Sequence, residues 1–141
     1  MNGTRRTAAV LCMIALFFTG CSGARSAGPP VTVTPAAGES SLLIKASSFR
    51  FEPNTIIVQR GDTVLFLIEN TSGSTHNFSL KDPSGTLLLN IDLPGRTTQR
   101  AKVTFTEAGD YEFYCDKPFH PAMGMKGRIE ARQAGPGRLK M

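Results

Sequence analysis

The chain has 141 residues, 40% of them hydrophobic, and a formal net charge of +5 at pH 7. This length indicates one folded domain with short flanking segments. The basic residues are scattered and no run of Lys and Arg reaches five, which argues against a nucleic-acid-binding protein. Arg5 and Arg6 lie in a segment that we expect to be removed. Their loss leaves a net charge near +3, which a mildly basic solvated surface explains.

Residues 1–20 are expected to form an export signal. A short polar start with paired arginines precedes an apolar run of eleven residues from Ala8 to Phe18. That run is too short for a transmembrane helix, which needs about 20 residues. A basic start followed by a short apolar run is typical of a secretory signal.

The end of this segment, FTGC at residues 18–21, resembles a bacterial lipobox, although Phe18 stands where Leu is usual. The resemblance implies that the chain is cut before Cys21 and that the Cys21 thiol is diacylated. Two acyl chains give stable membrane anchoring. Cleavage without lipidation would release the protein into the periplasm, so both routes place the domain outside the cytoplasm.

Residues 21–40, which follow the signal, are expected to be the lipidated cysteine and a flexible tether. From residue 22 onward this segment is rich in Gly, Pro, Ser and Ala and has no apolar periodicity. The folded domain is expected over 41–132, and 133–141 is expected to be a flexible basic tail.

Short apolar and β-branched runs separated by turn sequences fill the expected domain. The runs are SLLIKASSFRFEP, NTIIVQRGDTVLFLIEN, HNFSL, AKVTFTEAGDYEFYC and GRIEAR, and the turn sequences include DPSGT and LPGR. In the fourth run, alternation places Val103 and Phe105 on one face of a strand, and Tyr111, Phe113 and Cys115 on one face of the next. This pattern predicts an all-β sandwich or barrel.

The loop FYCDKPFHPAMGMKG contains the residues that carry chemistry. Cys115, His120, Met123 and Met125 fall within eleven residues, and the chain has one other histidine, His76, at the start of an expected strand. A thiolate, two imidazoles and a weak axial thioether form the trigonal site of blue-copper electron-transfer proteins. With Cys12 in the signal and Cys21 as the lipid site, Cys115 is left unpaired in the domain, and a metal ligand role explains it.

Other uses of these residues are less consistent with the sequence. Structural zinc sites usually need closely spaced Cys or His pairs such as CxxC, and none is present. A Cys–His nucleophile pair on one loop is weak support for an enzyme, and two histidines cannot supply a second copper centre. We therefore expect a protein that is not an enzyme.

Residues 41–131 resemble the cupredoxins, the small type 1 blue-copper proteins that include plastocyanin and azurin. The matching segments are FEPNTIIVQRGDTVLFLIEN, HNF, LPGRTT, EAGDYEFYC and the loop end GMKG. The resemblance implies a Greek-key β-sandwich with one copper ion near one end. It further implies His76, Cys115 and His120 as equatorial ligands, Met125 as the axial ligand, and Asn77 as the residue whose hydrogen bonds join the two ligand loops.

The axial ligand remains open between two methionines. Met123 follows His120 by three residues, as in the HPxM loops of some cupredoxins, and Met125 follows it by five. A loop with four residues between Cys and His is more often paired with the longer spacing, so Met125 is preferred.

The function expected from these observations is electron transfer by a copper ion that cycles between Cu(I) and Cu(II), at the outer face of a bacterial membrane. The expected partners are redox proteins of cytochrome or oxidase type, which meet an apolar patch around His120, and the protein itself is expected to be a monomer. The alternative is a periplasmic copper carrier that delivers copper to an oxidase. A copper-free sandwich used for adhesion is the third possibility.

Overall fold

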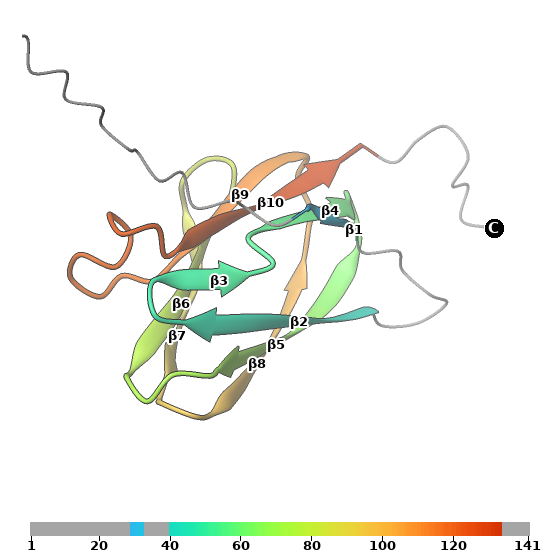
Figure 1. Ribbon diagram of the computed structural model, residues 1–141. Helices are drawn as coiled ribbons and strands as arrows, with labels where there is room; N and C mark the ends of the chain where they lie inside the picture. The colour runs from blue at the N-terminus through green and yellow to red at the C-terminus, as the bar shows by residue number, and fades with distance from the viewer. Residues whose placement is uncertain (1–28, 33–39, 134–141) are drawn as a thin grey trace, which may run out of the picture.

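The computed structural model describes residues 29–32 and 40–133, which form two β-sheets packed face to face (Figure 1). The larger sheet has the strand order β1 (Val31–Thr32), β4 (Thr55–Gln59), β10 (Lys126–Arg132), β9 (Gly109–Tyr114), β6 (His76–Lys81) and β7 (Leu87–Leu93). The smaller sheet has the order β3 (Arg50–Glu52), β2 (Ser40–Ser47), β5 (Thr63–Asn70) and β8 (Thr98–Thr104). The expected all-β sandwich is therefore confirmed.

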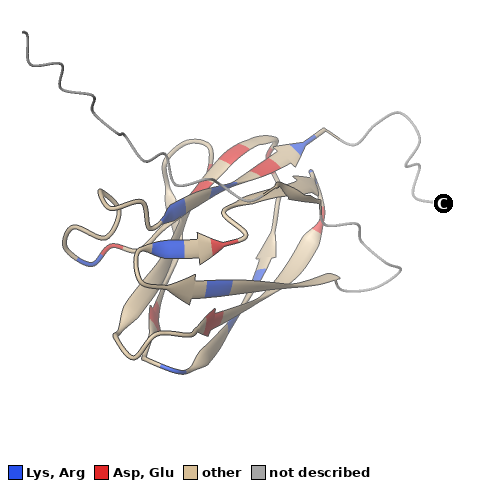
Figure 2. Ribbon diagram, in the orientation of Figure 1, with Lys and Arg blue, Asp and Glu red and all other residues tan. Residues whose placement is uncertain are grey.

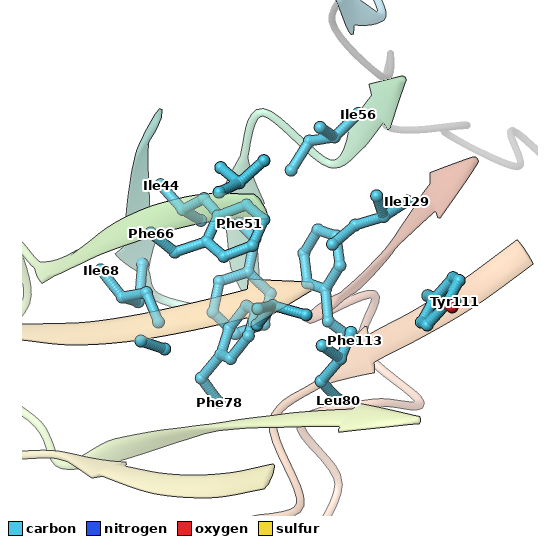
Figure 3. Close-up of a cluster of buried hydrophobic side chains, with 14 of the residues drawn as sticks. Ile44, Phe51, Ile56, Phe66, Ile68, Phe78, Leu80, Tyr111, Phe113 and Ile129 are labelled. Atoms are coloured by element: carbon cyan, nitrogen blue, oxygen red, sulfur yellow. The ribbon is translucent and has the colours of Figure 1, made fainter. Parts of the chain in front are cut away.

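The space between the sheets is filled by aromatic and branched aliphatic side chains (Figure 3). The rings of Phe78 and Phe113 stack with centroids 5.2 Å apart, and Phe51 meets both rings edge-on at 5.7 and 5.5 Å. Full burial of one such ring contributes about 1.5–3 kcal/mol. As alternation predicts, Tyr111, Phe113 and Cys115 are all buried on the same face.

The start of the described chain differs from the expected tether. Val31 and Thr32 pair in parallel with Ile56 and Ile57 of β4, so this short piece extends the larger sheet. A β-branched valine beside the open edge of a strand favours such pairing, although the segment has no apolar periodicity. The export signal, Cys21 and the tail from 134 onward lie outside the described residues.

Strand β7 is the second departure. The sequence analysis identifies the turns on both sides of it but not the strand, because its first three residues are all leucine and do not alternate with polar residues. β7 lies at the edge of the larger sheet and pairs with β6 alone in that sheet, and its first two residues, Leu87 and Leu88, are exposed.

Three strand ends meet at one end of the sandwich. β9 runs antiparallel to both β6 and β10. Its last residue, Tyr114, pairs with Lys126 at the start of β10 and with Ser79 of β6, and the chain after Tyr114 continues toward the start of β6. The loop between β9 and β10 closes this end (Figure 1). Figure 2 shows that basic and acidic residues are interspersed along the strands. The described part of the chain contains no helix that is long and apolar enough to cross a membrane.

Candidate metal centre

His76 is the first residue of β6, and its side chain is 2% exposed. β6 lies between β7 and β9, and five of its six residues are buried. Cys115 directly follows β9 and is fully buried, because it continues the inward face set by Tyr111 and Phe113. His120 lies in the loop between β9 and β10 and is half-buried.

These three side chains converge on one point. Cys115 Sγ lies 3.3 Å from His120 Nδ1 and 4.0 Å from His76 Nδ1. The two Nδ1 atoms are 3.2 Å apart. All three candidate ligand atoms lie within 4.8 Å of one another. The structure thus brings together the thiol and both imidazoles that the sequence analysis selects.

The loop that carries His120 is fastened at its base by backbone hydrogen bonds. The Met125 amide donates to the His120 carbonyl at 2.9 Å, and the Cys115 amide donates to the Met125 carbonyl at 3.1 Å. Within the loop, the His120 amide donates to the Lys117 carbonyl at 3.1 Å. These bonds hold Cys115 and His120 in a fixed relation without help from a ligand.

The two candidate axial methionines differ in their surroundings. Met125 is fully buried at the base of the loop, whereas Met123 is 42% exposed. A buried methionine whose backbone is hydrogen-bonded to Cys115 and His120 is the better candidate for a weak axial ligand. An exposed methionine is better suited to contact with another molecule.

Asn77 joins the two ligand-bearing segments. Its Oδ1 accepts a hydrogen bond from the Asp116 amide at 2.6 Å, and its Nδ2 donates to Asn90 Oδ1 at 3.0 Å. Asn90 in turn donates to the Asp116 carboxylate at 2.9 Å, so edge strand β7 also supports the loop. The sequence does not reveal the contact between Asn90 and Asp116, because it depends on how β7 pairs with β6.

Two aromatic side chains belong to the surroundings of His120: Phe119, its neighbour in the chain, and Phe49, which contacts its ring. Phe119 is 80% exposed with φ at 67°, and the ring of Phe49 meets the His120 ring edge-on with centroids 5.0 Å apart. The expected apolar surface near His120 is therefore present in Phe119 and Met123. Phe49 was missed, and no signal in the sequence links a turn residue 71 positions upstream to this loop.

Burial lowers the pKa of His76 from its ordinary value of 6.5, and the neighbouring His120 lowers it further by repulsion between charged rings. A lowered pKa keeps the imidazole neutral at neutral pH, which is the form that binds a metal. Two imidazoles beside a buried thiol are a donor set that suits copper, and a thioether would add a soft ligand that zinc seldom uses.

Comparison with known proteins agrees with this donor set. Residues 38–132 match the model of the family described as copper binding proteins, plastocyanin/azurin family. The chain belongs to this family. Membership confirms the cupredoxin resemblance and the expected copper cofactor, and the His–Cys–His cluster is consistent with one type 1 copper ion.

Two curated relatives illustrate the similarity. The chain is 32% identical to the copper-resistant cuproprotein CopI of Rubrivivax gelatinosus over 106 residues, which is 64% of each protein. It is 35% identical to chloroplastic plastocyanin of Oryza sativa subsp. indica over 88 residues, which is 56% of this chain and 53% of that protein. The match thus spans less than two thirds of either relative's own length.

Solved structures share the fold at lower sequence identity. Auracyanin from Roseiflexus castenholzii superposes with a TM-score of 0.58 at 18% identity, covering 68% of this chain and 98% of that one. The metal binding domain of the Streptococcus pneumoniae D39 Cu(I) exporting P-type ATPase CopA gives the same TM-score at 16% identity, covering 76% and 97%. At this identity the likeness concerns the fold alone.

Proposed function

We propose that this cupredoxin is an electron carrier in which His76, Cys115, His120 and Met125 hold one copper ion. The bound copper supplies a one-electron couple between Cu(I) and Cu(II). The observation that carries the proposal is the cluster of one sulfur and two imidazole nitrogens within 4.8 Å of one another. Soft sulfur favours Cu(I) and imidazole suits both states, so one ligand set serves both forms.

The frame around the ligands supports rapid electron transfer. Cys115 and His120 are fixed by hydrogen bonds between the backbone of Met125 and their own backbone groups, and His76 starts a central strand. A site held in this way needs little rearrangement when an electron arrives or leaves, which keeps the barrier to transfer small. The chain's own residues thus supply positioning rather than a chemical reaction, and we propose that the protein is not an enzyme.

The exposed side of His120 is the proposed port for electrons. Phe119 and Met123 offer apolar surface beside it. A small apolar contact of this kind suits the brief, weak encounters of redox proteins. The proposed partner is therefore another redox protein, of cytochrome or oxidase type. We do not propose a nucleic-acid partner. We propose that the protein acts as a monomer, tethered through diacylated Cys21 to the outer face of a bacterial membrane.

A copper carrier is the second candidate, and one observation favours it. The relative from Rubrivivax gelatinosus is named a copper-resistant cuproprotein. A carrier that delivers copper to an oxidase would use the same ligands but would hold Cu(I) in preference to Cu(II). The stability of the oxidised form therefore separates the two functions.

The test is a visible spectrum of the purified protein after addition of one equivalent of Cu(II). We expect an intense thiolate-to-copper band that a mild reductant bleaches. Cys115→Ser should abolish the band, because the thiolate is the source of the transition. Cys21→Ser is the matched control: it should keep the band, since Cys21 is not a proposed ligand, and it should move the protein from the membrane fraction to the soluble fraction.

Each alternative outcome has a distinct meaning. Retention of Cu(I) without a stable coloured Cu(II) form would favour the copper carrier. Failure to bind copper in either oxidation state would contradict both functions. A band that survives in Cys115→Ser would overturn the proposed ligand set.

A further inference from the structure

The ring of His76 has a second nitrogen, and that atom contacts a residue to which no role has yet been given. Nδ1 faces the cluster, whereas Nε2 lies 2.9 Å from the hydroxyl oxygen of Ser72. A neutral imidazole carries one proton, on either nitrogen, and only the nitrogen without it can bind a metal. The partner of Nε2 therefore decides whether Nδ1 is ready to bind.

The hydrogen bonds around Ser72 favour one direction for this contact. The Ser72 hydroxyl lies 2.8 Å from Asn70 Oδ1 and 3.2 Å from the Ser74 carbonyl oxygen. Both of these atoms can only accept, so the hydroxyl has two partners for its proton other than His76 Nε2. The hydroxyl oxygen is then left to accept a proton from His76 Nε2.

The orientation of the Asn70 side chain amide is fixed by its own hydrogen bonds. Asn70 is 1% exposed, and its Nδ2 donates to the carbonyl oxygens of Ser74, Leu93 and Pro94 at 2.8, 2.8 and 3.1 Å. Its Oδ1 also accepts from the Ser72 amide at 3.0 Å. An inverted amide would face three carbonyl groups with an oxygen atom, so Oδ1 must point toward Ser72.

The loop that carries Ser72 has little freedom to move. The Thr71 amide donates to the Ala46 carbonyl at 2.8 Å, and the Arg96 amide donates to the Ser72 carbonyl at 3.0 Å. Gly95 packs so closely against the Gly73 carbonyl that a side chain at position 95 would overlap it. The turn LPGR, whose proline and arginine frame Gly95, thus serves as a support for the loop before His76.

We infer that Ser72 is a positioning residue that fixes His76 in the tautomer with its proton on Nε2. The relay runs from His76 Nε2–H to Ser72 Oγ–H and on to Asn70 Oδ1. It leaves a lone pair on Nδ1, which faces Cys115 Sγ at 4.0 Å and His120 Nδ1 at 3.2 Å. The consequence for copper rests on the proposed function, but the tautomer does not.

The relay has a measurable effect on a bound metal. A hydrogen-bond acceptor at the second ring nitrogen makes an imidazole a more basic ligand, and loss of such a partner costs about 10–100-fold in metal affinity. The more electron-poor Cu(II) depends more on ligand basicity than Cu(I) does. A tenfold loss of affinity for Cu(II), with the affinity for Cu(I) unchanged, would raise the reduction potential by about 59 mV.

The first test is nitrogen NMR of the metal-free protein at a pH where histidine is neutral. Couplings between the ring nitrogens and ring protons distinguish the two tautomers. We expect wild-type His76 to carry its proton on Nε2, Ser72→Ala to give a mixture, and Ser72→Thr to restore the wild-type pattern. Ser74→Ala is the matched control in the same loop, because only the backbone carbonyl of Ser74 takes part in these hydrogen bonds.

The second test is the reduction potential of the same four copper-loaded proteins. Ser72→Ala should have the raised potential, and Ser72→Thr and Ser74→Ala should match wild type. Equal tautomers and potentials in Ser72→Ala and Ser74→Ala would overturn the inference. If Ser72→Ala does not fold, the metal-free wild-type protein still tests the inference. A proton on Nδ1 of His76 in that protein would by itself overturn it. A wild-type protein that binds no copper would refute the proposed function, while the tautomer would still test Ser72.

Discussion

At the scale of single residues, the two methionines of the loop differ in burial, and this difference leads to a prediction. Met125 is fully buried, whereas Met123 is 42% exposed. Met125→Leu keeps the volume of the side chain but removes the thioether. We expect it to raise the reduction potential of the copper protein, because Cu(II) loses a weak donor and gains an apolar neighbour. Each tenfold loss of Cu(II) affinity corresponds to about 59 mV, which voltammetry resolves.

Met123→Leu is the matched control for this change. It should leave the potential and the visible spectrum close to those of wild type, and it should alter at most the rate of electron exchange with a partner. The opposite result, a shift with Met123→Leu and none with Met125→Leu, would assign the axial position to Met123.

At the scale of elements, β10 must approach β9 closely for the loop between them to close. A Cβ atom at Gly127 would overlap the Phe113 ring and would lie 2.5 Å from the Asn54 carbonyl oxygen. The backbone carbonyl cannot move away without disturbing the pairing of β4 with β10. Gly127→Ala should therefore reduce the free energy of unfolding by about 1–3 kcal/mol, as overpacking generally does. Urea denaturation of the metal-free protein measures this loss.

Gly73→Ala provides the comparison, since a Cβ atom there would have no neighbour within 4 Å. Its stability should stay within about 0.5 kcal/mol of wild type, as for most surface substitutions. Equal stability of the two variants would mean that β9 and β10 can separate enough to admit a methyl group, and that the close approach is not required.

At the scale of the whole molecule, local patterns in the sequence predict most of the sandwich and the donor residues. Alternation identifies the inward face of β9 and hence the burial of Cys115, and the small number of histidines leaves His76 and His120 as the available imidazoles. What the sequence does not reveal depends on contacts between distant segments. Nothing in the sequence distinguishes Ser72 from the other serines, because its contact with His76 Nε2 depends on the fold of the loop. The contact between Phe49 and His120 likewise joins segments that are distant in the sequence.

The stability of the whole metal-free protein should depend on pH through His76. Its pKa lies below the ordinary 6.5, because burial and His120 disfavour the charged ring. When the pH falls below about 6.5, the unfolded chain takes up a proton that the folded protein accepts less readily, so folding is destabilised. At about pH 5.5, one unit below the ordinary pKa, the loss in free energy of unfolding is at most about 1.4 kcal/mol. Above about pH 7 this effect disappears.

The other acidic groups with a shifted pKa titrate below this pH range and do not contribute to the pH dependence within it. Hydrogen bonds from Ser84 lower the pKa of Asp82 below 3.8, and the Arg132 side chain lowers that of Glu130 below 4.5, so both stay charged at pH 5.5. Urea titrations at pH 5.5 and 7.5 should therefore show a difference that His76→Gln diminishes. An unchanged pH dependence in His76→Gln would assign the effect to another group. Because copper binds the neutral imidazole, copper affinity should also fall through the same range as protons compete for His76.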